Sequence, residues 1–428
     1  MKARNILFFS LGALLALSLT GCEQEDIMSI GDLEIPQKGS GVEIVVEPDD
    51  GITSVNALAK AVETYGAGTY ILRRNGVYYV EGKHPYQSNI VVKAEEGEGQ
   101  MPVIQPISDE QGAMPNYLFE LECDSARFEN VYFLLRDAAT GNLHDRAIRL
   151  TGTPTRVEID HCILETATST FFRCDNSNNN IFISNSVIRN ISRPTSASNG
   201  RVVDTRGHDQ DSIVLRNNYI YNVTGQILRQ DNSMTKYYEL SHNTCWNVAN
   251  VQNLDCPYEM VFENNIFANW GWKPLKNNPE NPQQWVFDLS AFSGRETMKD
   301  NLKISIRNNN FYFSPEVEAL YTQYPGSKRT DLSNATGVGL RADQFVYENN
   351  ISEVLTFDYA PALPLAYIQY FFANPSESDC TEPFDSDEDG VIGVINGEMF
   401  TFRYAPSFRS ATASTTGGPL GADIEVVF

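Results

Sequence analysis

Positive charge is scarce in this chain of 428 residues, which has 32 Lys and Arg against 55 Asp and Glu and a net charge of −23. Nucleic-acid binding depends on clustered basic side chains, so the composition argues against a nucleic-acid partner. The seven cysteines include no CxxC pair, so a zinc site built from thiolates is not expected. Hydrophobic residues make up 42% of the chain, which is enough for a sizeable core and argues against wholesale disorder.

Residues 1–21 have the pattern of an export signal and not of a folded element. Lys2 and Arg4 precede a mostly apolar stretch over 6–19, which is too short and too early to predict a membrane span. The stretch ends in Leu19-Thr20-Gly21-Cys22, which resembles the lipobox of bacterial lipoproteins. This resemblance implies cleavage before Cys22 and lipidation of Cys22. The alternative is a plain secretory signal with an incidental cysteine.

Residues 22–40 are polar and predict a tether. Its acidic run at 23–26 resembles the surface-export signal of Bacteroidota lipoproteins, although a solvated tether would have the same composition. Lipid chains hold a protein at a membrane by burying methylene groups. We therefore expect a protein that is lipid-anchored to the outer membrane through Cys22 and faces the cell exterior.

A short repeated pattern runs through the middle of the chain. Most copies have an apolar residue, a polar residue, Asn or His, and then a polar or small residue. The third position recurs every 22 to 44 residues, which is typical of the coils of a parallel β-helix with loops. Asparagine tolerates the left-handed backbone of a tight turn, and its amide can bond to the same position one coil away. The third-position residues are Asn130, His161, Asn185, Asn217, His242, Asn264, Asn308 and Asn349.

The apolar residues within each segment alternate with period two, which argues against a helical solenoid. We predict an all-β protein, a right-handed parallel β-helix with an N-terminal helical cap and an irregular C-terminal region. The cap and first coils are expected over 41–120, the parallel β-helix over 121–350 and a C-terminal capping region over 351–428. His161 and His242 are interpreted as members of the ladder and not as catalytic bases.

The two ends of the predicted β-helix resemble a known family. A strand, a short helix and two further strands between residues 44 and 80 resemble the N-terminal cap of pectate-lyase-like β-helices. Residues 416–421 resemble the terminal signature of a family of Bacteroidota β-helix lipoproteins, defined by domains of unknown function and associated with polysaccharide utilisation. The last six residues, 423–428, depart from that family's ending. The resemblance implies a surface lipoprotein whose partners include a polysaccharide and a glycan-uptake transporter.

A second column of residues follows the repeat. Six positions form this column at intervals of 24, 31, 25, 24 and 35 residues, so we expect them in one stripe on one face. Five of them follow an apolar pair, and Asn253 fits the spacing only. The residues are Arg149, Arg173, Asp204, Arg229, Asn253 and Asp288. Arg206 is expected on the same side by strand alternation. A row of guanidinium groups suits the recognition of carboxylate or sulfate groups. The alternative is pairing between Arg and Asp that only solvates the face.

The four tryptophans all lie between residues 246 and 285. Trp270 and Trp272 fall in a predicted loop just after the arginine stretch, and exposed aromatic rings can stack on the face of a pyranose. We therefore predict that Trp270 and Trp272 bind sugar rings. The alternative is that both rings pack between the loops of neighbouring coils.

A lyase acting on uronates needs a group that neutralises the carboxylate, a base for the C5 proton and a donor for the leaving oxygen. Residues 204–208 weakly resemble the Arg-bearing coil of the chondroitin and alginate lyase group, which makes Arg206 and Arg173 the candidate catalytic residues of a lyase. That group carries a Lys and two Glu on the preceding coil, where this chain has residues 168–170 and Arg173.

Residues 385–392 match the first eight positions of a calcium loop, with Asp385, Asp387 and Asp389 at the ligand positions. Calcium is therefore the candidate cofactor, and an acidic turn is the alternative. Residues 337–342 fit the pattern G-x-G-x-x-A but lack a surrounding strand–helix–strand unit, so no nucleotide cofactor is expected.

Three functions remain open on the sequence. The favoured one is a cell-surface lipoprotein that binds an acidic, uronate-containing polysaccharide through Arg149, Arg173, Asp204 and Arg229. The alternative is a polysaccharide lyase that uses the same groove. A structural or adhesion protein is the third, because a fold does not determine a function.

Overall fold

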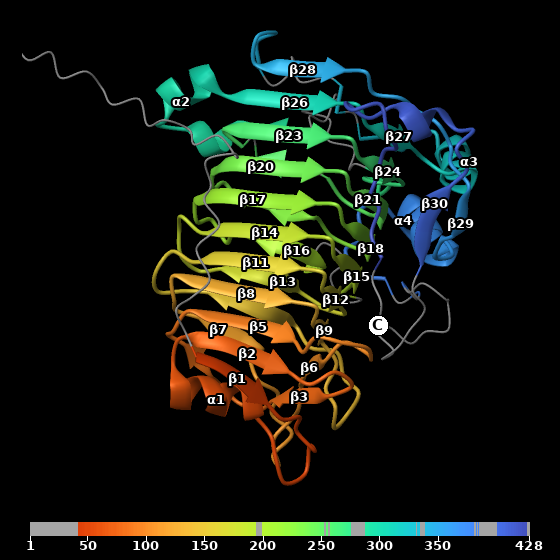
Figure 1. Cartoon of the computed structure of the whole chain (residues 1–428). Coiled ribbons are helices and arrows are strands. Elements are labelled where there is room, and N and C mark those ends of the chain that lie inside the picture. Colours follow the sequence, from red (N-terminus) through yellow and green to blue (C-terminus); the bar gives the residue numbers. More distant parts are fainter. Residues whose placement is uncertain are drawn as a thin grey trace, which may run out of the picture. The chain divides into compact units, whose positions relative to one another are not determined.

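Three parallel sheets form the body of the protein. The computed structural model describes residues 42–193, 199–251, 254–255, 257–274, 287–330, 332–333, 339–380, 382, 384 and 400–425. From β2 to β28, successive strands of the chain belong to different sheets, and strands of the same sheet stack one above the other in chain order (Figure 1). The chain therefore winds in coils, with one strand in each sheet per complete coil.

Sheet A has eleven strands within the described residues and is parallel throughout. It is continuous across residue 120, so the first coils and the later ones belong to one solenoid. Its strands are β1 (Val42–Val46), β2 (Gly68–Leu72), β5 (Ile90–Ala94), β8 (Ser125–Glu129), β11 (Arg156–Asp160), β14 (Asn180–Ser184), β17 (Gln210–Arg216), β20 (Thr235–Ser241), β23 (Glu259–Glu263), β26 (Lys303–Arg307) and β28 (Phe345–Glu348).

Sheet B follows sheet A around each coil. Its described strands are β3 (Val77–Val80), β6 (Val103–Pro106), β9 (Tyr132–Leu134), β12 (Ile163–Glu165), β15 (Val187–Ile191), β18 (Tyr219–Val223), β21 (Thr244–Val248), β24 (Ile266–Ala268) and β27 (Asn310–Tyr312).

Sheet C completes each coil. Its described strands are β4 (Pro85–Tyr86), β7 (Phe119–Leu121), β10 (Arg146–Leu150), β13 (Thr170–Cys174), β16 (Arg201–Asp204) and β19 (Leu228–Arg229). A separate parallel pair follows, β22 (Leu254–Asp255) and β25 (Phe287–Asp288).

The connections between parallel strands of one sheet pass through the other two sheets. Such crossovers are right-handed in nearly all proteins, because a twisted strand packs back onto its sheet only in that sense. The predicted all-β, right-handed parallel β-helix is confirmed. Apolar side chains fill its interior in rows, as where Phe128 lies between Phe119 and Phe133, with ring centroids 4.8 and 5.3 Å away.

Four helices lie outside the coils in the described residues. Helix α1 (Ala57–Tyr65) buries Leu58, Ala59 and Val62 in the same core as the first coils, which confirms the helical N-terminal cap. No described helix is both long and apolar enough to span a bilayer. The other three helices are α2 (Glu296–Asn301), α3 (Pro315–Gln323) and α4 (Leu365–Ala373).

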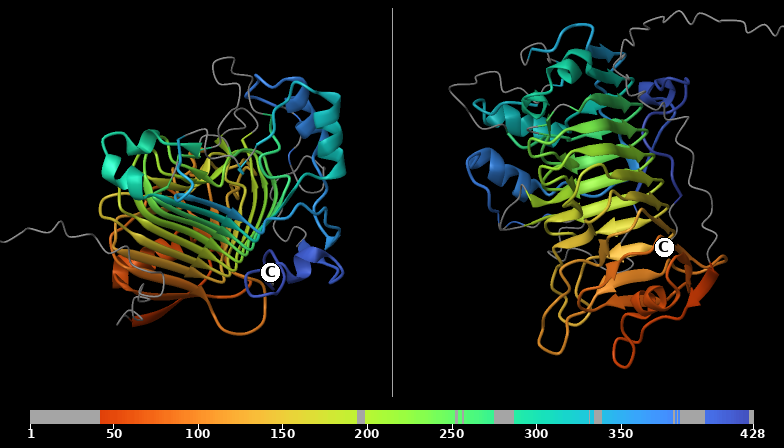
Figure 2. Two further views of the ribbon diagram at one scale, coloured as in Figure 1. Left: turned by 90° about the horizontal axis from the view of Figure 1, so that it is seen from above. Right: turned by 90° about the vertical axis from the view of Figure 1, so that its left-hand side faces the viewer.

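The C-terminal region covers the side of the solenoid. Its antiparallel pair, β29 (Phe357–Tyr359) and β30 (Thr401–Tyr404), lies beside sheet B together with α4 (Figures 1 and 2). Phe402 contacts the outward-facing rings of Tyr219 and Tyr221 on β18, with centroids 5.0 and 5.6 Å apart. Residues 351–428 were expected to cap the solenoid, but the described part buries the outer face of sheet B.

A left-handed residue turns the chain from sheet A into sheet B in successive coils. All eight third-position residues of the repeat have positive φ values, from 51° for Asn185 to 62° for Asn264. Asparagine is enriched in this conformation because its short polar side chain can bond locally. The two histidines of the column, His161 and His242, adopt the same conformation, with φ of 52° and 53°. The predicted turn column is therefore confirmed.

The continuous amide ladder lies one residue later than predicted. The side-chain oxygens of Asn243, Asn265 and Asn309 each accept both the backbone N–H and the side-chain amide of the asparagine one coil before, at 2.8 to 3.1 Å. Because the left-handed residue turns the chain, the next side chain points into the solenoid, and these three residues are fully buried. The third-position residues instead point outward.

A second ladder at the far end of sheet B was not predicted. Asn190, Asn222, Asn247 and Asn269 also have positive φ, and their amides bond from coil to coil at 3.2 to 3.4 Å. The signal in the sequence is an asparagine five residues after the third-position residue of the same coil. Two ladders thus hold the coils in register at both ends of sheet B.

Replacing Asn265 by Ala tests the buried ladder. The change leaves the N–H of Asn243 and the carbonyl of Leu240 without their partners in the interior, which should lower the free energy of unfolding by about 2–4 kcal/mol. Denaturant unfolding measures this difference. Asn142→Ala, at an exposed position, is the control and should change stability by less than about 0.5 kcal/mol. Equal effects of the two substitutions would contradict the ladder's role.

Candidate binding face on sheet C

A column of charged residues runs along the outer face of sheet C. The strand register pairs Glu120 with Arg149, Arg149 with Arg173, Arg173 with Asp204, and Asp204 with Arg229. Neighbouring strands are about 4.8 Å apart in a sheet, so the column is a straight row along the solenoid axis. The predicted stripe is present from Arg149 to Arg229, and Glu120 extends it by one coil. Asn253 lies outside the described residues, and Asp288 lies on β25, which pairs with β22 and not with sheet C.

Carboxylates neutralise the part of this column from Glu120 to Arg173. Arg149 donates to Glu120 and, through Nε, to Asp175 at 2.7 Å. Arg173 donates through Nε to the other oxygen of Asp175 at 2.9 Å, and Lys83 lies 3.0 Å from Glu120. Burial tends to raise the pKa of Asp175, but the hydrogen bonds from both arginines outweigh it and hold that pKa below its usual value. Ion pairs between arginines and acidic residues, the alternative interpretation of the stripe, are therefore present on this face.

Asp204 is the centre of the part of the column that continues to Arg229. Its side chain is only 3% exposed and accepts bonds from Arg201 at 2.8 Å and from Arg229 at 3.2 Å. The backbone N–H of Arg206 donates to the same carboxylate at 3.1 Å. With these bonds made and the side chain buried, Asp204 positions its neighbours, and the predicted direct contact between Asp204 and a ligand is not supported.

Arg206 lies beside the column and not on the strand. Strand β16 ends at Asp204, and Arg206 has φ of 53°, so strand alternation does not determine where its side chain points. The residue is exposed and forms no ion pair with any described residue. Arg206 is therefore an available cation next to arginines that already have partners.

The two tryptophans predicted to bind sugar are part of the interior. Trp272 is fully buried against Tyr367 and Phe371 of helix α4, and Trp270 is 7% exposed and stacks on Phe267 at 4.3 Å between centroids. The prediction is wrong for two reasons: helix α4, far away in the sequence, covers Trp272, and Trp270 packs into the core of the solenoid. Packing, the alternative interpretation, is what the structure shows.

An aromatic ring does lie at the column, but at a different position. The guanidinium carbons of Arg146 and Arg149 lie 5.8 and 5.6 Å from the ring centroid of Tyr117, which is half-buried. Such cation–π contacts hold arginine side chains flat against an aromatic face. Tyr117 precedes β7 and has no place in the repeat, so the spacing gave no signal for it.

The role of Asp175 as a partner of the arginines could have been predicted, because it follows Arg173 by two residues and so points to the same side of the strand.

The predicted calcium ligands Asp385, Asp387 and Asp389 lie outside the described residues, as does the predicted lipidation site Cys22. Among the described residues, no group of three or more metal-binding side chains gathers at one place.

Comparison with known proteins gives few matches. No protein-family model matches the chain, and no curated protein matches its sequence. Among solved structures, the chain is similar to a mutant of the PL6 family alginate lyase AlyGC, with 18% sequence identity and a TM-score of 0.41. The match covers 54% of this chain and 34% of that one, so this chain spans about a third of the length of the lyase.

Substituting Asp204 by Asn tests whether this carboxylate holds the column together. Arg201, whose side chain is 10% exposed, would lose its buried ion pair with this carboxylate, so the free energy of unfolding should fall by roughly 3–5 kcal/mol. Asp231→Asn is the matched control, because Asp231 pairs with the same Arg229 but is 40% exposed, and it should cost less than about 1 kcal/mol. If both variants unfold at the same denaturant concentration, Asp204 is not the centre of the network.

Proposed function

We propose that the outer face of sheet C binds an acidic, uronate-containing polysaccharide, and that the protein does so as a cell-surface lipoprotein during glycan utilisation. The observation that carries this proposal is the straight column from Glu120 to Arg229, in register over five coils. A row of hydrogen-bonding groups along a solenoid axis suits an extended polymer, because solenoids present elongated binding surfaces.

Arg173 is the residue of the column best placed to meet a carboxylate. Its Nε is bonded to Asp175, and its two terminal nitrogens have no partner among the described residues. A guanidinium in this state can still donate two parallel bonds to a ligand carboxylate while Asp175 holds its orientation. Arg149 keeps one terminal nitrogen in the same way, because it uses Nε and the other nitrogen for Asp175 and Glu120.

A polysaccharide lyase is the second candidate, and Arg206 is the observation that favours it. In a β-elimination the C5 proton goes to a base, the bond from C4 to the glycosidic oxygen breaks, a C4–C5 double bond forms and the leaving oxygen takes up a proton. Arginine holds its proton strongly, so the exposed Arg206 would stabilise the developing negative charge or supply a proton. Arg173 is oriented by its bond to Asp175 and would neutralise the uronate carboxylate.

Binding to polygalacturonate, alginate and chondroitin sulfate tests the proposal in affinity electrophoresis. We expect at least one polymer to retard the mature protein, with a dissociation constant that rises about tenfold in Arg173→Ala, since a charge-assisted bond contributes about 1.5–3 kcal/mol. Arg403→Ala, which removes an exposed arginine from β30, should bind unchanged. Ultraviolet absorbance in the same mixtures reports unsaturated products and would establish the lyase. Retardation by none of the polymers would refute the glycan proposal and favour a structural or adhesion role.

Lipid anchoring through Cys22 on the outer membrane, facing the exterior and next to a glycan-uptake transporter, belongs to the same proposal. One diacylated cysteine would supply the hydrophobic attachment. The Cys22→Ser variant of the full chain should leave the membrane fraction for the soluble fraction, as measured by fractionation and immunoblotting. A Cys22→Ser protein that stays with the membrane would contradict the anchor.

A structural calcium ion in the loop of Asp385, Asp387 and Asp389 also remains a proposal. Its support is the pattern of alternating oxygen ligands in the sequence.

A further inference from the structure

The C-terminal tail crosses the column of left-handed residues between sheets A and B, on a different side from the column of sheet C. Asn217 accepts a bond from the N–H of Asp423 at 2.8 Å and donates to its carbonyl at 3.2 Å. Asn264 accepts from the N–H of Thr415 at 2.8 Å. Between these two points, a Cβ at Gly421 would lie only 2.6 Å from the hydroxyl of Thr244, so the tail lies tightly against the solenoid.

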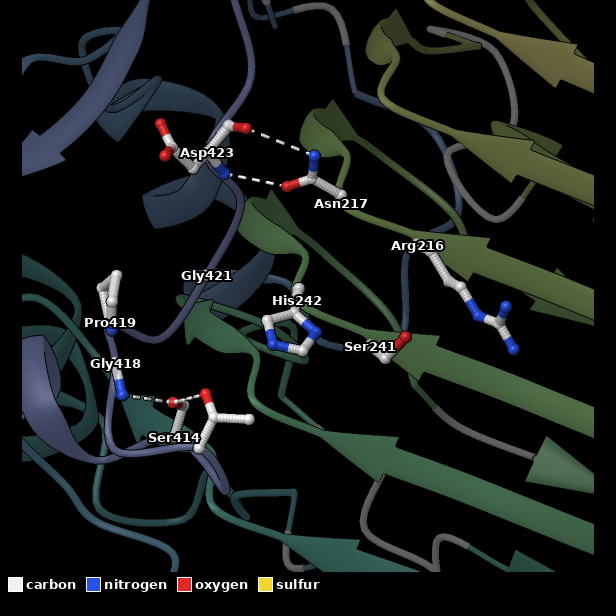
Figure 3. A pocket seen from close by; sticks show the side chains of 10 residues that line it. Arg216, Asn217, Ser241, His242, Ser414, Gly418, Pro419, Gly421 and Asp423 are labelled. Atoms are coloured by element: carbon white, nitrogen blue, oxygen red, sulfur yellow. Dashed lines mark hydrogen bonds between the residues drawn. The ribbon is translucent and has the colours of Figure 1, made fainter. Parts of the chain in front are cut away.

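The tail leaves the column between Thr415 and Gly421. The N–H of Gly417 donates to the carbonyl of Ser414 at 2.9 Å, and the N–H of Gly418 donates to its hydroxyl at 2.8 Å, so the tail folds into a turn here. A cavity of about 350 Å³ opens between this turn and the solenoid. Figure 3 shows the ring of His242 in this space, facing Gly418 and Pro419 of the tail.

Between Asn217 and Asn308, His242 is the column residue that forms no hydrogen bond with the described part of the tail. Its neighbours in the column, Asn217 and Asn264, both bond to the tail, whereas the imidazole of His242 forms no hydrogen bond with any described residue. His161, the other histidine of the column, lies 3.0 Å from Asp160 and does not line the cavity. Both ring nitrogens of His242 are therefore available to a ligand in the cavity.

The charges around the cavity do not favour an acidic ligand. Arg216 at its rim is bonded through two nitrogens to Glu239, at 2.6 and 2.8 Å. Asp423 adds a further carboxylate to the lining. Burial lowers the pKa of His242 below its ordinary value, so its ring is neutral at pH 7. The cavity is thus lined by a neutral imidazole, by the hydroxyls of Ser414 and Thr416, which bond to each other at 3.1 Å, and by Pro419.

We propose that this cavity, here named the His242 pocket, binds one neutral sugar residue, free or at the end of a glycan, with its hydroxyl groups bonded to the imidazole of His242. A neutral imidazole offers one donor and one acceptor, which matches a sugar hydroxyl that can both donate and accept. The hydroxyls of Ser414 and Thr416 also line the cavity. They bond to each other, which leaves one hydroxyl hydrogen of the pair for a ligand. The site is independent of the sheet C face and does not require the function proposed there.

NMR of the imidazole signals tests the pocket in the whole mature protein. The chain has five histidines, and the His242→Asn variant assigns the signal of His242. We expect glucose, galactose or mannose at millimolar concentration to shift that signal in a saturable way, and glucuronate to shift it at least tenfold less strongly. Saturation-transfer NMR, which observes the sugar's own signals and needs no histidine reporter, should show binding retained in His161→Asn and weakened at least tenfold in His242→Asn.

Asparagine is native to this column in other coils, so His242→Asn should fold, and a thermal melt checks that it does. Thr416→Val, in the tail, is the second variant and should also weaken binding. The pocket proposal is overturned if no neutral sugar shifts the His242 signal, if glucuronate binds more tightly than the neutral sugars, or if the folded His242→Asn protein binds as the unchanged protein does.

Discussion

The register of the coils depends on the interior hydrogen bonds of the asparagine ladder. In this ladder, each side-chain amide donates a hydrogen bond to the asparagine on the following coil. The donors are Asn218, Asn243, Asn265 and Asn309. A shift of one residue in any coil would leave these amides unpaired in the interior, at a cost of about 1–3 kcal/mol for each lost partner. Everything that lies on the outside of the solenoid in a straight row depends on this constraint.

The column on sheet C is the clearest consequence. Arg149, Arg173 and Arg229 come from different coils and line up because the coils are in register. Their carboxylate partners keep the guanidinium groups in fixed orientations, and burial of Asp204 makes the network around this residue rigid. A face preorganised in this way loses little side-chain entropy when an extended ligand binds. Arginines that are paired with carboxylates can therefore still serve as the recognition surface that we propose.

The sequence was sufficient for the fold because the repeat places the same residue types at the same corner of every coil. The left-handed turn at Asn217 and the stripe of Arg149 and Arg173 follow from spacing alone, since each depends only on the period of the coil. The burial of Trp272 could not be predicted, because it depends on helix α4, about a hundred residues later. The buried ladder was placed one residue early, because the spacing does not show which side chain a left-handed turn sends inward.

Hydrogen–deuterium exchange with and without polygalacturonate or alginate tests the central claim most directly, because it locates the ligand on the solenoid without any substitution. The account predicts that the bound polymer slows exchange in β10, β13 and β16 and in the turn at Arg206, while sheet A exchanges as before. Slower exchange confined to sheet A or to the C-terminal cover, or no change with either polymer, would contradict it.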